Sequence, residues 1–147
     1  MLDSSLFASP SHDDIERSLA CWPSVSGRLK PHAVSAFGDV FFQRPDGAIH
    51  RLDPLEGSVT VTATSAEHFN DLLEDKDWRD GNLMPELISL AMERGITREQ
   101  HQVFAFAPHP VFTGALRVEQ MMPMDLPVWH GIASQLFQAE GEEDGDK

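Results

Sequence analysis

The sequence predicts an α+β fold in which an antiparallel β-sheet packs with three to four helices. Segments rich in β-branched and aromatic residues follow one another between residues 33 and 63, separated by short turns. Helical periodicity dominates from about residue 64 onward. A chain of 147 residues can bury a core of its own. We therefore expect one domain over residues 1–139, followed by an acidic, disordered tail over residues 140–147.

A short amphipathic helix is predicted near the N-terminus. Ser11 or a neighbouring aspartate is suited to cap its start, and Pro23 limits its end. Its apolar stripe has the spacing i, i+4, i+7 and consists of Ile15, Leu19 and Trp22. The single Cys21 lies beside this stripe, where it is predicted to be a small buried residue, and its lack of a partner favours a reducing compartment.

Three strands are predicted to form an antiparallel meander after this helix. The first covers residues 33–43, with a bend or bulge at Gly38. The second covers residues 48–52 and the third residues 58–63. The turns between them contain proline, which presets φ, and glycine, which accepts a positive φ.

Helices dominate the predictions for the second half of the chain. A capping box over residues 64–67 begins one that runs to about Asp75, and Pro85 begins another that Gly95 ends. A last helix is predicted from Asp125 through about Gln138.

Two later strands are predicted between these helices, over residues 103–107 and 115–119. Residues 121–124 (Met-Met-Pro-Met) are predicted to form either an adaptable binding surface or a loop that packs onto the core.

The charge of the chain is its most unusual global property. There are 11 Lys and Arg against 24 Asp and Glu, a net charge of −13, and residues 140–147 carry five acidic residues and one basic residue. Binding to nucleic acid needs a basic footprint, so this balance argues against it. The sequence also has no apolar run long enough to span a membrane and no signal peptide, so we expect a cytoplasmic protein with no membrane partner.

The sequence offers little for catalysis. The seven histidines do not have the spacing of zinc ligands, so we expect no metal or other cofactor, and the histidines are assigned to surface or turn positions. Asp39 and Asp53 could pair as carboxylates, but an aspartate beside glycine or proline is ordinary in turns. We therefore assign no catalytic residues and expect no enzyme.

An acidic segment between residues 67 and 80 is the strongest candidate for a binding surface. On the predicted helix, four carboxylates follow the spacing i, i+4, i+7, i+8 and so share one face. Such a row is either an ordinary solvated face or a site for a basic partner, with an aromatic residue as anchor. The residues proposed to bind a partner are Glu67, Asp71, Glu74, Asp75, Asp77, Trp78 and Asp80.

A strand–turn–strand signature within this sequence resembles a known bacterial family. It comprises Ala36-Phe37-Gly38-Asp39-Val40-Phe41-Phe42, then Asp46-Gly47-Ala48-Ile49-His50-Arg51-Leu52-Asp53-Pro54, and it closes at Gly57. Further agreement lies in Ser65-Ala66-Glu67-His68-Phe69 with Leu72-Leu73, in residues 106–114 and in residues 118–136. The likeness spans roughly residues 33–138. The family that this sequence resembles is the C-terminal domain of type VI secretion immunity proteins that guard against DNase effectors.

The resemblance implies a non-enzymatic protein that binds and neutralises a cognate effector toxin, with the toxin's basic nucleic-acid-binding surface as the partner. In that family the domain commonly follows a GAD-like domain. Only about 32 residues precede the signature here, so no role of that domain is carried over. The alternatives are a housekeeping regulatory or scaffolding module and, third, a small hydrolase. The sequence leaves open whether the chain forms a homodimer.

Overall fold

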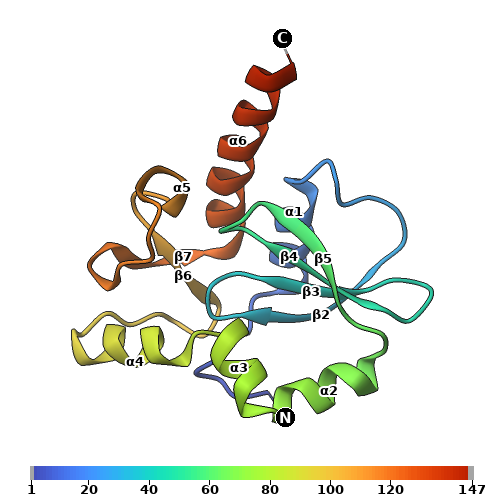
Figure 1. Ribbon diagram of the computed structural model, residues 1–147, viewed down its shortest axis with the longest axis horizontal. Helices are drawn as coiled ribbons and strands as arrows, with labels where there is room; N and C mark the ends of the chain where they lie inside the picture. The colour runs from blue at the N-terminus through green and yellow to red at the C-terminus, as the bar shows by residue number, and fades with distance from the viewer. Residues whose placement is uncertain (1, 146–147) are drawn as a thin grey trace.

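A five-stranded antiparallel sheet lies at the centre of the computed structural model, which describes residues 2–145, with side chains described for residues 2–138 (Figure 1). The order in this sheet is β1-β2-β3-β4-β5, and a second antiparallel sheet pairs β6 with β7. The strands are β1 (Phe7–Ala8), β2 (Lys30–Ser35), β3 (Val40–Gln43), β4 (Ile49–Asp53), β5 (Ser58–Ala63), β6 (Gln102–Phe106) and β7 (Met121–Asp125).

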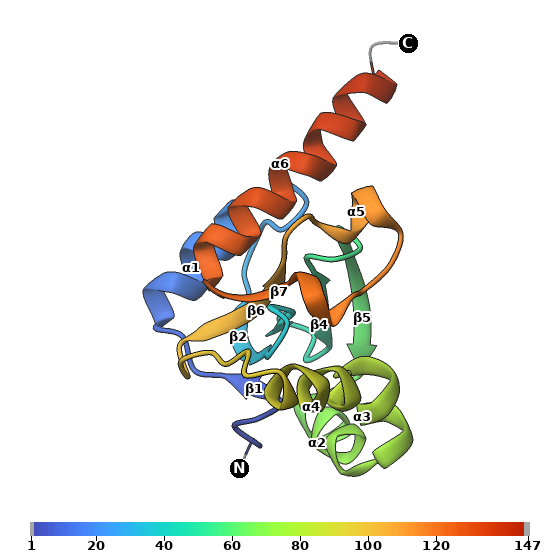
Figure 2. The same cartoon turned by 90° about the vertical axis from the view of Figure 1, so that its left-hand side faces the viewer.

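The helices gather at two opposite ends of the sheets. α1 packs against α6 at one end, and the consecutive helices α2, α3 and α4 lie together at the other, as both views show (Figures 1 and 2). The helices are α1 (His12–Ala20), α2 (Ala66–Glu74), α3 (Lys76–Asn82), α4 (Pro85–Glu93), α5 (Pro110–Thr113) and α6 (Leu126–Gly145), with a 3-10 turn, η1 (Val118–Gln120). The predicted α+β fold is confirmed.

Side-chain caps fix the starts of two predicted helices. Ser11 Oγ accepts the backbone N–H of Asp14 at 3.1 Å and begins α1. Ser65 Oγ accepts the N–H of His68 at 3.0 Å, so α2 begins one residue later than the capping box at residues 64–67 predicted. Cys21 is half-buried rather than buried, because it lies at the C-cap of α1, where the helix ends.

The single strand predicted over residues 33–43 is wrong, because the chain reverses within it. β2 and β3 pair antiparallel with Val34 opposite Val40, and the turn between them passes through Gly38 at φ +93°. Ser35 Oγ holds this turn by accepting the backbone N–H groups of Phe37 and Asp39 at 3.2 and 3.1 Å. The meander is thus longer than predicted, with β1 added at its edge.

The later strands also differ from the prediction. Residues 115–119, predicted as a strand, contain the start of η1, and the methionine-rich segment at 121–124 forms part of β7 rather than a loop. Its backbone pairs with β6, where Phe104 lies opposite Pro123, and Met121 enters the core at 5% exposure. Pairing with a distant strand therefore overrides the weak strand preference of this segment.

The predicted acidic tail overlaps the last helix. The backbone of α6 continues to Gly145, and this end of the helix projects away from the sheets (Figure 2). Residues 146–147 and the side chains beyond residue 138 lie outside the described residues, so the disorder of the tail stays a prediction. Within residues 2–145, none of the helices has the length and apolarity that crossing a membrane requires.

The turn between β2 and β3 contacts the helices through buried side chains. Trp22, which follows the end of α1, donates its indole N–H to Nδ1 of His130 on α6 at 2.8 Å, and His130 Nε2 donates to the Gly38 carbonyl at 2.7 Å. Trp129 donates to the Phe37 carbonyl at 3.3 Å. Burial lowers the pKa of His130 to about 4, so its imidazole is neutral in this position. His130 and His109 are buried, which corrects their assignment to the surface or to turns.

We expect Gly38→Ala to destabilise the fold far more than Gly47→Ala. Both glycines have φ above +90°, so each substitution costs about 1–2 kcal/mol of backbone strain. A Cβ at Gly38 would lie 2.8 Å from Trp129 Cδ1, whereas a Cβ at Gly47 would meet nothing within 4 Å. Overpacking at Gly38 adds about 1–3 kcal/mol. Urea unfolding of both variants measures the difference, and equal losses would show that the turn is not packed against Trp129.

Candidate functional site

The acidic segment proposed to bind a partner lies on α2 and α3, at the edge of the molecule. Glu67, Asp71 and Glu74 occupy one face of α2 and are exposed. We call these three residues the acidic row. No side-chain hydrogen bond or ion pair joins any of them to another part of residues 2–138, so their carboxylates are free to meet a partner.

Three of the other four predicted residues have side-chain contacts within the protein. Asp75 ends α2 with non-helical φ −85° and ψ 114°, so it does not extend the face of that helix as predicted. Its carboxylate accepts the N–H of Asp77 at 2.9 Å and caps α3. Asp80 pairs with Lys76 at 2.6 Å, and both side chains are exposed.

Trp78 is half-buried rather than free. Its ring makes an edge contact with buried Phe69, with ring centroids 6.0 Å apart. The structure therefore places the seven predicted residues together on two consecutive helices but gives Asp75, Trp78 and Asp80 structural contacts. Whether these seven residues bind a partner stays a proposal.

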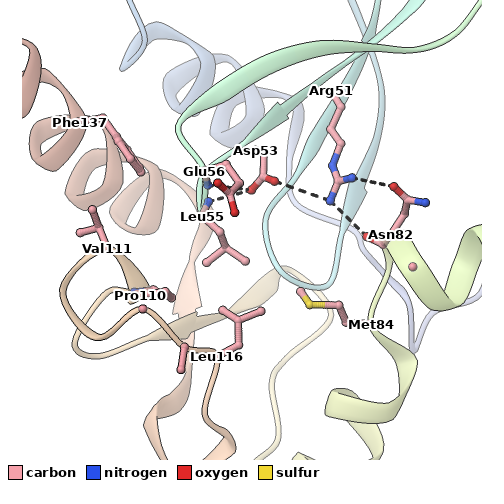
Figure 3. Close-up of a pocket in the computed structure, with 13 residues that line it drawn as sticks. Arg51, Asp53, Leu55, Glu56, Asn82, Met84, Pro110, Val111, Leu116 and Phe137 are labelled. Atoms are coloured by element: carbon pink, nitrogen blue, oxygen red, sulfur yellow. Dashed lines mark hydrogen bonds and ion pairs between the residues drawn. The ribbon is translucent and has the colours of Figure 1, made fainter.

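A cleft of about 480 Å³ lies beyond α3, between the β4–β5 turn and the segment that contains α5 (Figure 3). Its volume is in the range of ligand pockets. One part of its lining is polar and consists of Arg51, Asp53, Glu56 and Asn82. The rest is mainly apolar and includes Leu55, Met84, Pro110, Val111, Leu116 and Phe137.

Arg51 organises the polar part of the cleft. Its Nε donates to Asp39 at 3.2 Å, and its terminal nitrogens donate to the side-chain and backbone oxygens of Asn82 at 3.1 and 3.2 Å. Asp53 lies 3.9 Å away on the cleft side. The guanidinium N–H groups therefore donate to groups of the protein itself, and few donors remain to bind an anion (Figure 3).

Asp39 lies behind Arg51 and is buried, with 2% of its side chain exposed. Burial raises the pKa of Asp39 to about 6, and the adjacent Arg51 guanidinium opposes this rise. Ser35 Oγ also donates to its carboxylate at 2.6 Å. The same aspartate thus stabilises the β2–β3 turn and anchors the arginine that lines the cleft.

The β4–β5 turn carries the two carboxylates that line the cleft, Asp53 and Glu56. Asp53 Oδ1 accepts the backbone N–H groups of Leu55 and Glu56 at 2.8 and 3.3 Å, which confirms its predicted role in a turn. Glu56 is exposed, and within residues 2–138 its carboxylate has no hydrogen-bond or ion-pair partner. This part of the cleft therefore favours a cation over an anion.

The segment around α5 carries the largest exposed aromatic side chain of the described residues. Phe112 is 69% exposed, and it directly follows in sequence Val111, which lines the cleft. Leu116 in the same wall is 39% exposed. Exposed apolar side chains grouped on one segment are typical of contact surfaces.

The chemistry of this cleft suits recognition. Its described lining contains carboxylates, a guanidinium and an amide, but no hydroxyl, thiol or imidazole. His109 lies nearby, where its Nδ1 accepts from the N–H of Val111 at 3.0 Å and its Nε2 donates to the Pro54 carbonyl at 2.9 Å. Both of its nitrogens are thus occupied. Residues 2–138 also hold no cluster of three potential metal-binding side chains.

No local pattern in the sequence predicts this cleft. Asp39 and Asp53 were recognised as turn residues, but nothing local in the sequence shows that Arg51 lies between them. Asn82 and Leu116 come from segments far apart along the chain. The one available signal was the start of α3, because Asp75 before Lys76-Asp77 is a normal N-cap pattern that would have predicted this helix.

Comparison with family models shows which protein family this chain belongs to. The family model described as T6SS immunity protein Tdi1, C-terminal, matches residues 63–137, about half of the chain. The chain belongs to this Tdi1 C-terminal family. The match includes the acidic segment and α5 and most of the cleft's apolar wall, whereas Arg51, Asp53 and Glu56 precede it. The strand–turn–strand signature at residues 36–57 likewise lies outside the matched segment, although the suspected family is confirmed.

A solved structure shares the fold of this Tdi1 family member. The crystal structure of Atu4351 from Agrobacterium tumefaciens superposes with a TM-score of 0.60 at 20% sequence identity, over 88% of this chain. The chain spans 65% of the length of that protein. At this identity the likeness shows the fold alone. A search of curated proteins gives no match.

Replacing Arg51 with Met should destabilise the protein, and the loss should shrink at low pH. At pH 7 the substitution leaves the buried Asp39 without its cation, which costs about 3–5 kcal/mol. The pKa of Asp39 is already raised in the folded protein, and losing Arg51 raises it further. A carboxyl with a raised folded pKa loses stability as the pH rises through that value, so the penalty is largest above pH 6 and falls toward pH 4.

Urea unfolding at pH 7 and pH 5 measures this change relative to the wild type. Arg17→Met is the matched control, because Arg17 pairs with Asp13 and Asp14 while it is 62% exposed. An exposed pair contributes about 0–1 kcal/mol. A penalty for Arg51→Met that is equal at both pH values would contradict the proposed coupling to Asp39.

Proposed function

We propose that this protein is an immunity protein that binds a cognate type VI secretion effector toxin and neutralises it, without catalysing a reaction of its own. The observation that carries this proposal is the match of residues 63–137 to the Tdi1 immunity family. Neutralisation by tight association requires an accessible complementary surface rather than catalytic groups. The proposal places the protein in the cytoplasm, where it would protect the cell that makes it.

The acidic row supports a nuclease as the toxin. A nuclease binds the phosphates of its substrate with Lys and Arg, so its active-site face is basic. Glu67, Asp71 and Glu74 present three unpaired carboxylates on one face of α2, and Asp77 adds another exposed carboxylate on α3. Opposite charges of this kind accelerate the encounter of two proteins and orient them. An inhibitor held there would cover the surface that the nucleic acid needs.

Co-expression with a toxin tests the proposed function directly. Candidate effector genes from the same genome neighbourhood are expressed with and without this protein, and viable counts are compared. We expect full rescue from one of them and no toxicity from this protein alone. Survival that is equal with and without the protein for every toxic candidate would contradict the immunity function and favour a regulatory or scaffolding module.

Charge reversal tests the acidic row. Asp71→Lys combined with Glu74→Lys should slow association with the rescued toxin about tenfold at low salt and flatten the dependence of the rate on salt. Folding stability should change by no more than about 0.5 kcal/mol per site, because both residues are exposed.

The matched control is Glu93→Lys combined with Glu99→Lys, which makes the same change in net charge at exposed sites away from α2. Stopped-flow association at several salt concentrations measures both double variants. Equal association rates for the two double variants would show that the acidic row is an ordinary solvated surface.

A further inference from the structure

The cleft beside α5 has a lining that suits a particular kind of ligand. Its polar part contains one cation and two carboxylates, and behind that cation lies the buried carboxylate of Asp39. Because Arg51 is paired with both Asp39 and Asp53 and bonded to Asn82, the unpaired charge in the described lining is that of Glu56, and the charges of the site sum to a negative value. A phosphate or carboxylate ligand would be repelled there, and a cation would be attracted.

The apolar part of the cleft limits the shape of that cation. A small hydrated ion would gain nothing from Leu55, Met84 and Leu116, which line the space between the charged turn and α5. A long basic side chain matches both parts, because it carries an aliphatic stem that packs on apolar atoms and a charged end. Arginine fits best, because its planar guanidinium donates to two carboxylates at once.

The rim of the cleft indicates that this side chain comes from another protein. Phe112, which directly follows the lining residue Val111 in the chain, is 69% exposed, and Val111 and Leu116 are 37% and 39% exposed. A free amino acid would leave these side chains in water, whereas a protein loop around the arginine would cover them. An aromatic anchor beside a pocket filled by arginine is a common pattern at the centres of protein interfaces.

We propose that the cleft receives an arginine side chain of a partner protein, whose guanidinium meets Glu56 and Asp53 while its flanking apolar residues cover Val111, Phe112 and Leu116. The identification of that partner as the toxin rests on the proposed function. The arginine subsite itself does not rest on the proposed function, because it is argued only from the residues that line the cleft of this protein.

A small probe tests the subsite without any toxin. Nα-acetyl-arginine amide is titrated into the protein, and the methyl resonances of Leu55, Val111 and Leu116 are followed by NMR up to about 50 mM, since a single side chain binds with millimolar affinity at best. We expect saturable shifts of these methyl groups. The citrulline analogue has the same shape without the charge, and it should give no saturable shift.

Glu56→Gln should weaken binding of the arginine probe about fivefold, because it removes the unpaired carboxylate of the cleft while keeping the shape of the side chain. Glu93→Gln, which changes another exposed glutamate outside the cleft and the acidic row, should leave the affinity unchanged. The absence of saturable shifts in the wild type, or equal affinity for the wild type and Glu56→Gln, would overturn the proposal.

The toxin found by rescue then tests the apolar rim. Phe112→Ala should raise its dissociation constant about tenfold or more, whereas Met92→Ala, at a residue 61% exposed on α4, should not change it. Rescue without probe binding would overturn the subsite and leave the immunity function standing. Probe binding without rescue by any candidate would retain the subsite and reject the immunity function.

Discussion

The structure depends on the buried turn between β2 and β3. Its carbonyl groups at Phe37 and Gly38 would be unsatisfied in the core without the N–H groups of Trp129 and His130 on α6. His130 in turn accepts from Trp22, just after the end of α1. The backbone of this turn continues the connection, because the Phe104 N–H of β6 donates to the Ala36 carbonyl at 2.7 Å. One turn thus joins the main sheet, the small sheet and both terminal helices.

The same turn also positions the functional surface. Asp39 ends it, holds Arg51 on β4 and thereby fixes Asn82 at the end of α3. Contacts with a buried residue therefore hold the polar lining of the cleft in place, and its charge depends on which carboxylates Arg51 neutralises. The acidic row lies on a separate helix and has no such connection among residues 2–138. In the proposed complex, the row governs the rate of encounter, and the cleft and its rim govern the lifetime.

Local signals in the sequence were sufficient where a cap or a turn residue decides the conformation. Ser11 and Pro85 begin the helices they were expected to begin, α2 begins one residue after its predicted start, and the strand at residues 58–63 has the predicted bounds. The strand predicted over residues 33–43 failed because apolar residues flank the turn on both sides. Its polar residues, Ser35 and Asp39, are buried with their neighbours, so no exposed polar segment marks the reversal.

The sequence by itself determined the α+β class, the immunity family, the net charge of −13 and the carboxylate spacing on α2. Each of these depends on residues that are neighbours along the chain or on overall composition. Only the tertiary structure decided that Met121–Asp125 forms a strand, that His130 is a buried acceptor and donor, and that Arg51 lies between Asp39, Asp53 and Asn82. These features arise from contacts between residues far apart in the sequence, which the packing of the core brings together and no local pattern encodes.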